Sequence, residues 1–488
     1  MSSITADLYT ALPEVFLACA ALALLMLGVF KGDKAVRPVL NLSVVSVIVA
    51  LGLVLFLDTG DRTAFNGLFK TNSFIDFMKA LTLFGAALNI ILTLRYMERE
   101  SLDRFEIPVL MVLATVGMML MISANDLMTV YLGIELQSLA LYVCAAIRRD
   151  NLRSTEAGLK YFVLGALSSG MLLYGMSMIY GFTGATDFDL LTRVVADDIA
   201  ANGLPSVSLI FGVVFMIAGL AFKVSAVPFH MWTPDVYEGA PTPITAFFAV
   251  APKIAALALF MRVLMGPFLE LIDQWQQIIV VISLASMILG AFAAINQRNF
   301  KRLMAYSSIG HVGYALIGLA AGTQAGVAGV VVYLTIYLFM NIGTFACILS
   351  MRTNGGMVEG VDDLKGLSKT NPMMAAALAI FMFSMAGIPP LAGFFGKFYI
   401  FLAAVDAGLY TLAIIGVLSS VVGAFYYLRI IKLMYFDDPV DSFDTPIGME
   451  TSLIMAGTAA FTLLFFLAPE AILDQGKILG EVFFAIAG

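Results

Sequence analysis

Residues 221–235 read Ala-Phe-Lys-Val-Ser-Ala-Val-Pro-Phe-His-Met-Trp-Thr-Pro-Asp, and they interrupt an apolar run that begins near residue 206. Proline removes a backbone donor and clashes with the preceding helical turn, so a helix through this run must break near Pro228. Backbone that is not helical is tolerated at membrane depth only where protein or water satisfies its polar groups. The stretch therefore predicts a broken transmembrane helix with a small hydrated cavity beside Lys223.

A second apolar run is broken in the same way. Residues 387–397 read Gly-Ile-Pro-Pro-Leu-Ala-Gly-Phe-Phe-Gly-Lys and lie inside the run 372–404. A proline kink could explain either break alone, but two breaks, each with a lysine, at corresponding positions of two halves indicate a transport site. Each broken run is the fourth of five, which predicts two five-helix repeats, over spans 4–8 and 9–13. Because five is odd, the second repeat must be inverted relative to the first.

The composition indicates that lipid surrounds most of the chain. Hydrophobic residues make up 61% of the sequence and charged residues only 12%, with a mean hydropathy of +0.95, whereas a soluble protein carries about 25% charged residues. A transmembrane helix needs about 20 mostly apolar residues. Fourteen stretches qualify, near 9–30, 37–57, 74–95, 106–123, 126–147, 156–182, 206–230, 242–264, 275–296, 302–321, 326–351, 372–404, 408–435 and 451–468. The sequence therefore predicts an all-α polytopic membrane protein.

These spans divide the chain into four predicted parts. Three N-terminal helices occupy residues 1–105, the first repeat occupies 106–264, the inverted second repeat occupies 275–437, and a last helix with its tail occupies 451–488. The connecting segments are short, so none is expected to form a separate soluble domain.

Lys and Arg residues gather in alternate loops, which predicts the orientation of the spans. Cytoplasmic loops carry an excess of these residues. Seventeen of the 27 basic residues lie on one predicted side: Lys31, Lys34, Arg37, Arg95, Arg99, Arg104, Arg148, Arg149, Arg153, Arg298, Lys301, Arg302, Arg352, Lys365, Lys369, Arg429 and Lys432. The other side has Arg62, Lys70, Arg193 and Lys477, with Arg262 near it. Both termini are therefore expected on the periplasmic side of a bacterial inner membrane, with an organellar membrane as the alternative.

The five lysines outside these loops fall inside predicted spans, and Glu135 joins them: Lys79, Lys160, Lys223, Lys253 and Lys397. A charged side chain at mid-membrane costs about 2.5–3.5 kcal/mol even on a lenient scale. These groups must therefore be paired, hydrated or neutral for part of the time. A buried lysine near a carboxylate changes its proton occupancy in response to small structural shifts, so the series is a candidate proton path.

Several of these residues also have structural interpretations. Glu135 could be a helix-packing carboxylate or half of a structural ion pair, and Lys160, a turn into its span, could snorkel to the surface. Lys253 lies near mid-membrane, where snorkelling is hard to sustain. Lys79 follows Asp76 by three residues, which is helical ion-pair spacing, and we interpret Lys79 as structural.

The cysteines and histidines limit the redox chemistry of the chain. Cys19, Cys144 and Cys347 are far apart, and their spacing supports neither an iron–sulfur centre nor a disulfide. Paired haem ligation is not supported by His230 and His311 alone, and no basic run suits nucleic acid. The chain is therefore expected to hold no metal or redox cofactor. Each histidine could relay protons, since histidine titrates near neutral pH, or could be a hydrogen-bonded structural residue.

The stretch 223–235 resembles the signature of the proton-translocating, antiporter-like membrane subunits. That family includes subunits of complex I (the respiratory NADH:quinone oxidoreductase), of Mrp-type Na⁺/H⁺ antiporters and of related membrane hydrogenases. The continuation Val-Tyr-Glu-Gly-Ala-Pro-Thr-Pro-Ile-Thr-Ala-Phe, residues 236–247, leads to Ala-Pro-Lys253 and is similar to the subunit N branch in particular. Residues 301–311, Lys-Arg-Leu-Met-Ala-Tyr-Ser-Ser-Ile-Gly-His, and residues 387–397 fit the same family.

The resemblance implies proton-transfer roles for Glu135, Lys160, Lys223, Lys253 and Lys397. In that reading Glu135 pairs with Lys223 and sets its proton affinity, Lys253 is the central relay, and Lys397 connects to the opposite side. The lysine at position 397 argues against the related subunit M branch, which has a glutamate at the corresponding position. The resemblance also implies NADH, FMN, iron–sulfur clusters and quinone in partner subunits. The implied neighbours are subunit M, small subunit K, the lateral helix of subunit L, and lipids.

The sequence is compatible with three functions. The favoured hypothesis is a complex I subunit that translocates protons without touching electrons. An Mrp-type Na⁺/H⁺ antiporter subunit would instead show sodium-dependent transport without NADH. A structural scaffold would lose assembly, rather than pumping, when Lys253 is replaced.

Overall fold

The computed structural model describes residues 3–57 and 60–487, so the outer limits of the predicted division, residues 1 and 488, lie outside the described part. The long helices are α2 (Leu12–Lys31), α3 (Val36–Phe56), α4 (Ser73–Arg99), α5 (Glu106–Ser123), α6 (Leu127–Ala145), α7 (Leu152–Thr183), α9 (Val207–Val224), α11 (Thr242–Met265), α12 (Ile272–Ile295), α13 (Phe300–Ala321), α14 (Gln324–Ser350), α18 (Tyr410–Phe436) and α19 (Met449–Leu464).

The shorter helices are α1 (Ser3–Thr10), α8 (Phe188–Asn202), α10 (Thr233–Gly239), α15 (Leu367–Thr370), α16 (Pro372–Ala386), α17 (Ala392–Asp406) and α20 (Glu470–Ala487). Two small antiparallel hairpins join β1 (Arg62–Ala64) to β2 (Phe69–Thr71), and β3 (Arg352–Thr353) to β4 (Gly356–Met357).

The predicted spans are confirmed. Within the described part of the chain, thirteen helices are long and apolar enough to cross a membrane. The remaining predicted span, 372–404, is the consecutive pair α16 and α17, which are separated by the predicted break. Local hydrophobicity and proline placement therefore decide the architecture.

The two predicted repeats pack in the same order. In the first, α5 pairs with α6 and α7 with α9; in the second, α12 pairs with α13 and α14 with α16 and α17. Glycines allow the first pair of each repeat to approach closely. A Cβ atom on Gly117 would lie 2.5 Å from the backbone nitrogen of Gln137, and one on Gly290 would lie 2.6 Å from that of Gly310. Small residues of this kind are typical of membrane helix interfaces, and their recurrence supports the predicted repeats.

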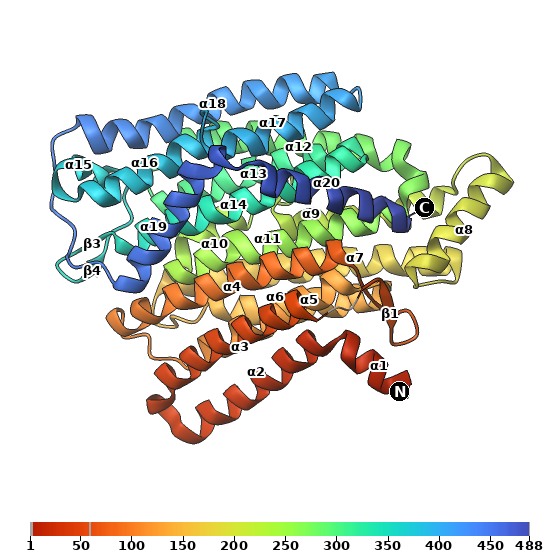
Figure 1. The fold of residues 1–488 in the computed structure, drawn as a ribbon, viewed down its shortest axis with the longest axis horizontal. Helices are drawn as coiled ribbons and strands as arrows, with labels where there is room; N and C mark the ends of the chain where they lie inside the picture. The colour runs from red at the N-terminus through yellow and green to blue at the C-terminus, as the bar shows by residue number, and fades with distance from the viewer. Residues whose placement is uncertain (1–2, 58–59, 488) are drawn as a thin grey trace.

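Helix α11 lies at the centre of the bundle (Figure 1). Every residue from Thr242 to Met265 is buried, and α4, α5, α9 and α14 pack around it. Helices α13 and α14 are also buried over most of their length. Protein rather than lipid must therefore satisfy the polar side chains on these three helices.

The two ends of the bundle carry different loops. Both chain ends lie at one end of the bundle in Figure 1, together with α8 and β1, whereas α15 and the β3–β4 hairpin lie at the other. The latter end, here called the basic end, carries the loop residues Arg352, Lys365 and Lys369. This separation agrees with the predicted alternation of loops.

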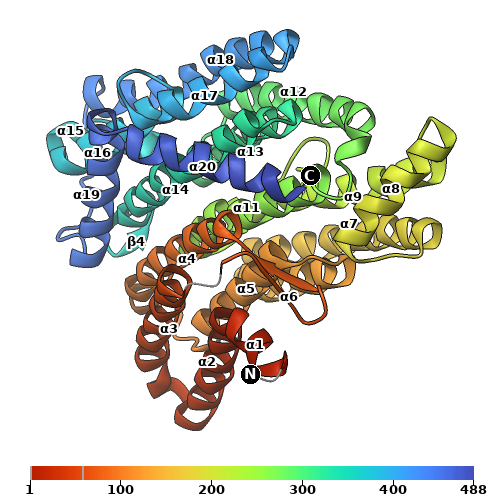
Figure 2. The same ribbon diagram turned by 45° about the vertical axis from the view of Figure 1, so that its right-hand side comes forward.

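Helix α20 was expected only as a tail. It packs across α14 and against α4 (Figure 2), and its Phe483 meets Phe74 edge-on with ring centroids 4.8 Å apart. The apolar residues of α20 lie on one side of the helix, and protein covers that side. Polar residues on the other side make the sequence too polar to be recognised as a span.

Candidate functional site

The first broken helix forms as predicted. Helix α9 ends at Val224, Ser225 adopts a left-handed φ of 68°, and the chain becomes helical again only in α10. Trp232 Nε1 donates a hydrogen bond of 3.1 Å to the carbonyl oxygen of Phe222 across the break. Protein contacts therefore hold the break open directly after Lys223, which occupies the last turn of α9.

Lys223 and Glu135 lie near each other but not in direct contact. Lys223 Nζ donates to Ser138 Oγ at 2.7 Å, whereas Glu135 accepts a hydrogen bond from Ser169 Oγ. Among the ion pairs between described residues, none joins Glu135 to Lys223. The prediction that these two side chains pair directly is therefore wrong. Glu135 lies one turn before Ser138, the hydrogen-bond partner of Lys223, on α6.

Lys160 lies in a charged cluster at the basic end rather than in the buried core. Its side chain is 40% exposed, and Nζ lies 2.6 Å from Asp235 Oδ2 and 2.7 Å from Glu156 Oε1. Arg302 Nη1 bridges Asp235 at 2.6 Å and Glu238 at 3.0 Å. An open polar cavity lies among these carboxylates and Arg302. Because the side chain of Lys160 reaches the surface, its geometry matches the structural interpretation that this lysine snorkels.

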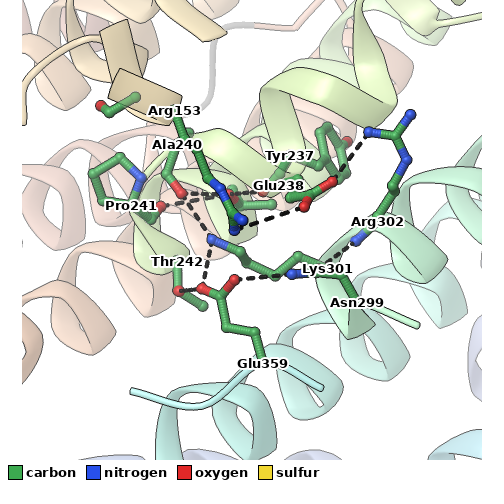
Figure 3. A network of polar contacts seen from close by, with 12 residues as sticks. Arg153, Tyr237, Glu238, Ala240, Pro241, Thr242, Asn299, Lys301, Arg302 and Glu359 are labelled. Atoms are coloured by element: carbon green, nitrogen blue, oxygen red, sulfur yellow. Dashed lines mark hydrogen bonds and ion pairs between the residues drawn. The ribbon is translucent and has the colours of Figure 1, made fainter. Parts of the chain in front are cut away.

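Figure 3 shows the adjoining contacts, at the turn between α10 and α11. Lys301 Nζ donates to the carbonyl oxygen of Ala240 at 3.0 Å and pairs with Glu359 Oε1 at 2.7 Å. Glu359 also accepts from Thr242 Oγ1 at 3.3 Å and from Asn299 Nδ2 at 3.1 Å. The second repeat is thereby tied to the turn that follows the first broken helix.

Lys253 lies at the centre of the bundle and is 1% exposed. Its Nζ donates to Ser308 Oγ on α13 and lies 5.5 Å from the ring centroid of Tyr237. Ser308 Oγ lies 2.7 Å from the hydroxyl of Tyr337 on α14. No carboxylate of the described residues forms an ion pair with Lys253, and its hydrogen-bond partner is the hydroxyl of Ser308.

His311 lies one turn further along α13 and is buried. Its Nδ1 is 2.5 Å from the Tyr333 hydroxyl and its Nε2 is 3.0 Å from the Tyr427 hydroxyl. The Tyr427 hydroxyl is itself 2.5 Å from Ser307 Oγ. His311 therefore forms one hydrogen-bonded cluster with Tyr333, Tyr427 and Ser307. His230, at the first break, takes part in none of these bonds.

The second broken helix also forms as predicted and holds Lys397. Helix α16 ends before Gly387, whose φ is 87°. Lys397 Nζ donates to the carbonyl oxygens of Met385 and Ala386, at 2.9 and 3.2 Å, and to Ser420 Oγ at 2.8 Å. The carbonyls at a helix C-terminus lack helical partners and carry partial negative charge, so this end of α16 favours a cation.

A narrow cavity connects the surroundings of His311 and Lys397. Its lining includes His311, Tyr314, Lys397, Ser420 and Tyr427. Ser308, His311 and Tyr314 recur every three residues along α13, and Lys397 Nζ lies 4.8 Å from the ring centroid of Tyr314. Helix α13 thus carries polar contacts from Lys253 to Lys397. We call Lys253, His311 and Lys397, with the hydroxyls bonded to each of them, the central polar row.

The serines and tyrosines of this row carry no charge that would mark them in the sequence. Inside apolar spans these residues read as packing, and only the spacing of Ser307, Ser308 and His311 within the family motif could have indicated them. Further buried polar atoms near the first break have no hydrogen-bond partner in the described protein: Gln137 Oε1, Tyr142 Oη, Ser225 Oγ, Thr233 Oγ1 and Tyr237 Oη. Buried polar groups normally bond to protein or ordered water, so the region between α6 and α11 is suited to water.

Lys79 has a different partner from the expected one. Its Nζ lies 2.7 Å from Glu14 Oε1 on α2, and both side chains are 3% exposed or less. Asp76 instead accepts a hydrogen bond from Thr71 Oγ1 at 2.8 Å. The expected Lys79–Asp76 pair is therefore wrong, although the structural interpretation of Lys79 fits a buried ion pair. Glu14 was overlooked because it lies near the start of the first span.

Comparisons with known proteins agree with this architecture. The family model described as "NADH:quinone oxidoreductase/Mrp antiporter, TM" matches residues 124–423. A Rhodospirillum rubrum protein named NADH-quinone oxidoreductase subunit N is 63% identical over 96% of each chain, and Rhizobium meliloti subunit N 1 is 57% identical over 99% of each. A chain of Thermus thermophilus respiratory complex I aligns with a TM-score of 0.79 and 29% identity, over 95% of this chain and 98% of that one. A chain of the Dietzia sp. Mrp complex shares the fold, with a TM-score of 0.85 at 21% identity, over 99% and 100%.

Proposed function

The chain belongs to the NADH:quinone oxidoreductase/Mrp antiporter transmembrane family, within its subunit N group, and we propose that its buried lysines carry the translocated protons. It is a proton-translocating membrane subunit of complex I. The central polar row is the observation that carries the proposal. Intramembrane ionisable residues are costly and mark ion or proton pathways. Here two buried lysines and a buried histidine, each hydrogen-bonded to hydroxyl groups, follow one another along α13.

In this proposal protons enter at the basic end. Asp235, the ion-pair partner of the 40% exposed Lys160, lines an open polar cavity there, so this pair can exchange protons with bulk water. Glu135 sets the proton affinity of Lys223 through its charge, with Ser138 as the lysine's direct partner. Water bound to the unpaired polar atoms near the first break would carry protons from Lys223 towards Tyr237 and Lys253.

The central polar row then carries protons across the second repeat. Lys253 donates to Ser308, and the imidazole of His311 accepts a proton on one nitrogen and releases one from the other through Tyr333 or Tyr427. Lys397 receives protons from the narrow cavity and passes them to the opposite side. We assign His311 a relay role and assign none to His230.

We further propose that the chain itself is not a redox centre. Its three cysteines are free and lie on α2, α6 and α14, and NADH, FMN, iron–sulfur clusters and quinone would bind partner subunits. Redox energy would reach the lysines as movement of charge or of packed helices in those partners. A change in the position of one charge alters the proton occupancy of the next, since opposite charges favour and like charges disfavour the ionised form.

Membership of complex I also bears on the neighbours of the chain and on its orientation in the membrane. Other membrane subunits of complex I surround the chain, and we propose subunit M, subunit K and the lateral helix of subunit L as its direct neighbours, with lipid over the rest. The chain is a multi-pass protein of the bacterial inner membrane. The concentration of Lys and Arg at the basic end favours a cytoplasmic basic end and periplasmic termini.

Sodium dependence separates this function from the antiporter alternative. Inverted membrane vesicles with the chain, and vesicles from a deletion strain, would be energised with NADH in sodium-free buffer and again with added sodium. We expect proton uptake that requires both the chain and NADH and is unchanged by sodium. NADH oxidation by an artificial acceptor controls for the hydrophilic partners. Sodium-dependent proton movement without NADH would contradict the proposal and support the antiporter.

A further inference from the structure

Three arginines line a crevice at the basic end that the proton path does not use. Arg95 and Arg99 lie in the last turns of α4, and Arg352 follows α14. The start of α19 closes the crevice, and the carboxylate residue Asp444, on the loop before α19, also lines it. The crevice therefore lies where three helices from distant parts of the sequence meet, away from Lys160 and the central polar row.

The positive charge in this crevice is only partly compensated. Arg352 is 3% exposed and is satisfied by Glu100 Oε1 at 2.8 Å and by a backbone carbonyl. Both carboxylate oxygens of Asp444 accept from backbone nitrogens of the β3–β4 turn, at 3.0 and 2.8 Å. Arg95 and Arg99 form no ion pair and no side-chain hydrogen bond with the described residues. Two guanidinium groups thus remain available to an anion.

An apolar stripe leads from these arginines towards the middle of the membrane. Most of α4 is buried, but Phe84, Leu88 and Ile91 are only half-buried and lie on the same side of the helix as Arg95. Phe84 meets Phe339 of α14 with ring centroids 5.7 Å apart. Phe339 stacks in turn on a phenylalanine of α19, at 3.7 Å. Aromatic and aliphatic side chains from the three helices thus form one continuous half-exposed surface.

The length of this surface matches one lipid leaflet. Phe84 precedes Arg95 by eleven residues, which is about 16 Å at the rise of an α-helix. One leaflet contributes half of a hydrocarbon core about 30 Å thick, or about 15 Å. Basic pockets between transmembrane helices on the cytoplasmic side bind acidic lipid headgroups. We propose that this crevice binds one anionic phospholipid, with its phosphate at Arg95 and Arg99 and an acyl chain along Phe84, Leu88 and Ile91.

A photoactivatable phosphatidylglycerol, with the reactive group on an acyl chain, tests the proposal. The whole complex would be placed in phosphatidylcholine nanodiscs with a trace of this probe, and labelled peptides would be identified. We expect labelling of α4, α14 and α19 in the wild-type chain. Arg95→Gln with Arg99→Gln should weaken this labelling about 30-fold, since each basic residue contributes about 1 kcal/mol and 1.4 kcal/mol is a factor of ten.

Matched controls make each outcome decisive. Arg104→Gln with Arg149→Gln removes the same charge from exposed positions at the same end and should leave the labelling unchanged. A photoactivatable phosphatidylcholine should label the crevice weakly, and millimolar inorganic phosphate should not displace the anionic probe. Artificial-acceptor activity and retention of the chain confirm assembly of each variant. Absent labelling in wild type, equal labelling by both lipids, or displacement by phosphate alone would overturn the proposal.

Discussion

Replacing Lys397 with alanine is expected to lower NADH:quinone reductase activity and NADH-driven proton uptake together, by about tenfold or more, which is about 1.4 kcal/mol or more of barrier. Lys397 is the ionisable group of the central polar row at the second break, and its ammonium is held by two carbonyls and Ser420. Alanine leaves no group there that can take a proton from the cavity beside His311. Protons that cannot leave should stop the coupled electron transfer as well.

The matched controls separate proton transfer from helix capping. Lys397→Met keeps most of the side-chain volume and should fail like alanine, whereas Ser420→Ala keeps the ammonium and should retain most activity. Lys432→Ala removes a lysine that is 64% exposed and should have no effect. Normal pumping by Lys397→Met in an assembled complex would show that Lys397 only caps α16.

Replacing Lys79 with methionine is expected to destabilise the chain by about 3–5 kcal/mol, because removal of one partner leaves a buried charge uncompensated. Glu14 and Lys79 join α2 to α4, and neither is more than 3% exposed. The double variant Lys79→Met with Glu14→Leu should recover most of this loss, since an apolar pair of similar volume is often as stable as a buried ion pair. Retention of the chain in the purified complex after heating would measure the effect.

An exposed ion pair supplies the comparison for this variant. Lys432 and Asp437 are 2.9 Å apart, with the lysine 64% exposed, and exposed pairs contribute about 0–1 kcal/mol. Lys432→Met should therefore shift the heating profile far less than Lys79→Met. Equal shifts for the two single variants, or a double variant less stable than Lys79→Met alone, would contradict a buried pair between α2 and α4.

The fold could be predicted because its determinants are local. Runs of about 20 apolar residues define the spans, and the prolines near 228 and 389 place both breaks. The partners of the charged residues could not be predicted in this way. Glu14 precedes Lys79 by 65 residues and Asp235 follows Lys160 by 75, and only the packing of distant helices brings them together.

The sequence indicated which ionisable residues belong to the site better than it indicated which residues contact them. The lysines stand out because charge is rare in apolar spans, whereas Ser308, Tyr333 and Tyr427 are common packing residues and carry no such signal. The Glu135–Lys223 pair is an example. The family resemblance implied that these two residues act together, but it did not indicate that Ser138 would be the direct partner of Lys223. Likewise, hydrophobicity alone did not identify α20 as a packed helix.

Proton uptake and NADH oxidation recorded in the same inverted vesicles test the role of Lys253 most directly. Wild type and Lys253→Ala would be compared, with NADH oxidation by an artificial acceptor as the control for assembly. The predicted result is an unchanged acceptor rate, with quinone reduction and proton uptake falling together. Unchanged proton uptake by Lys253→Ala in an intact complex would contradict a proton path through the central polar row.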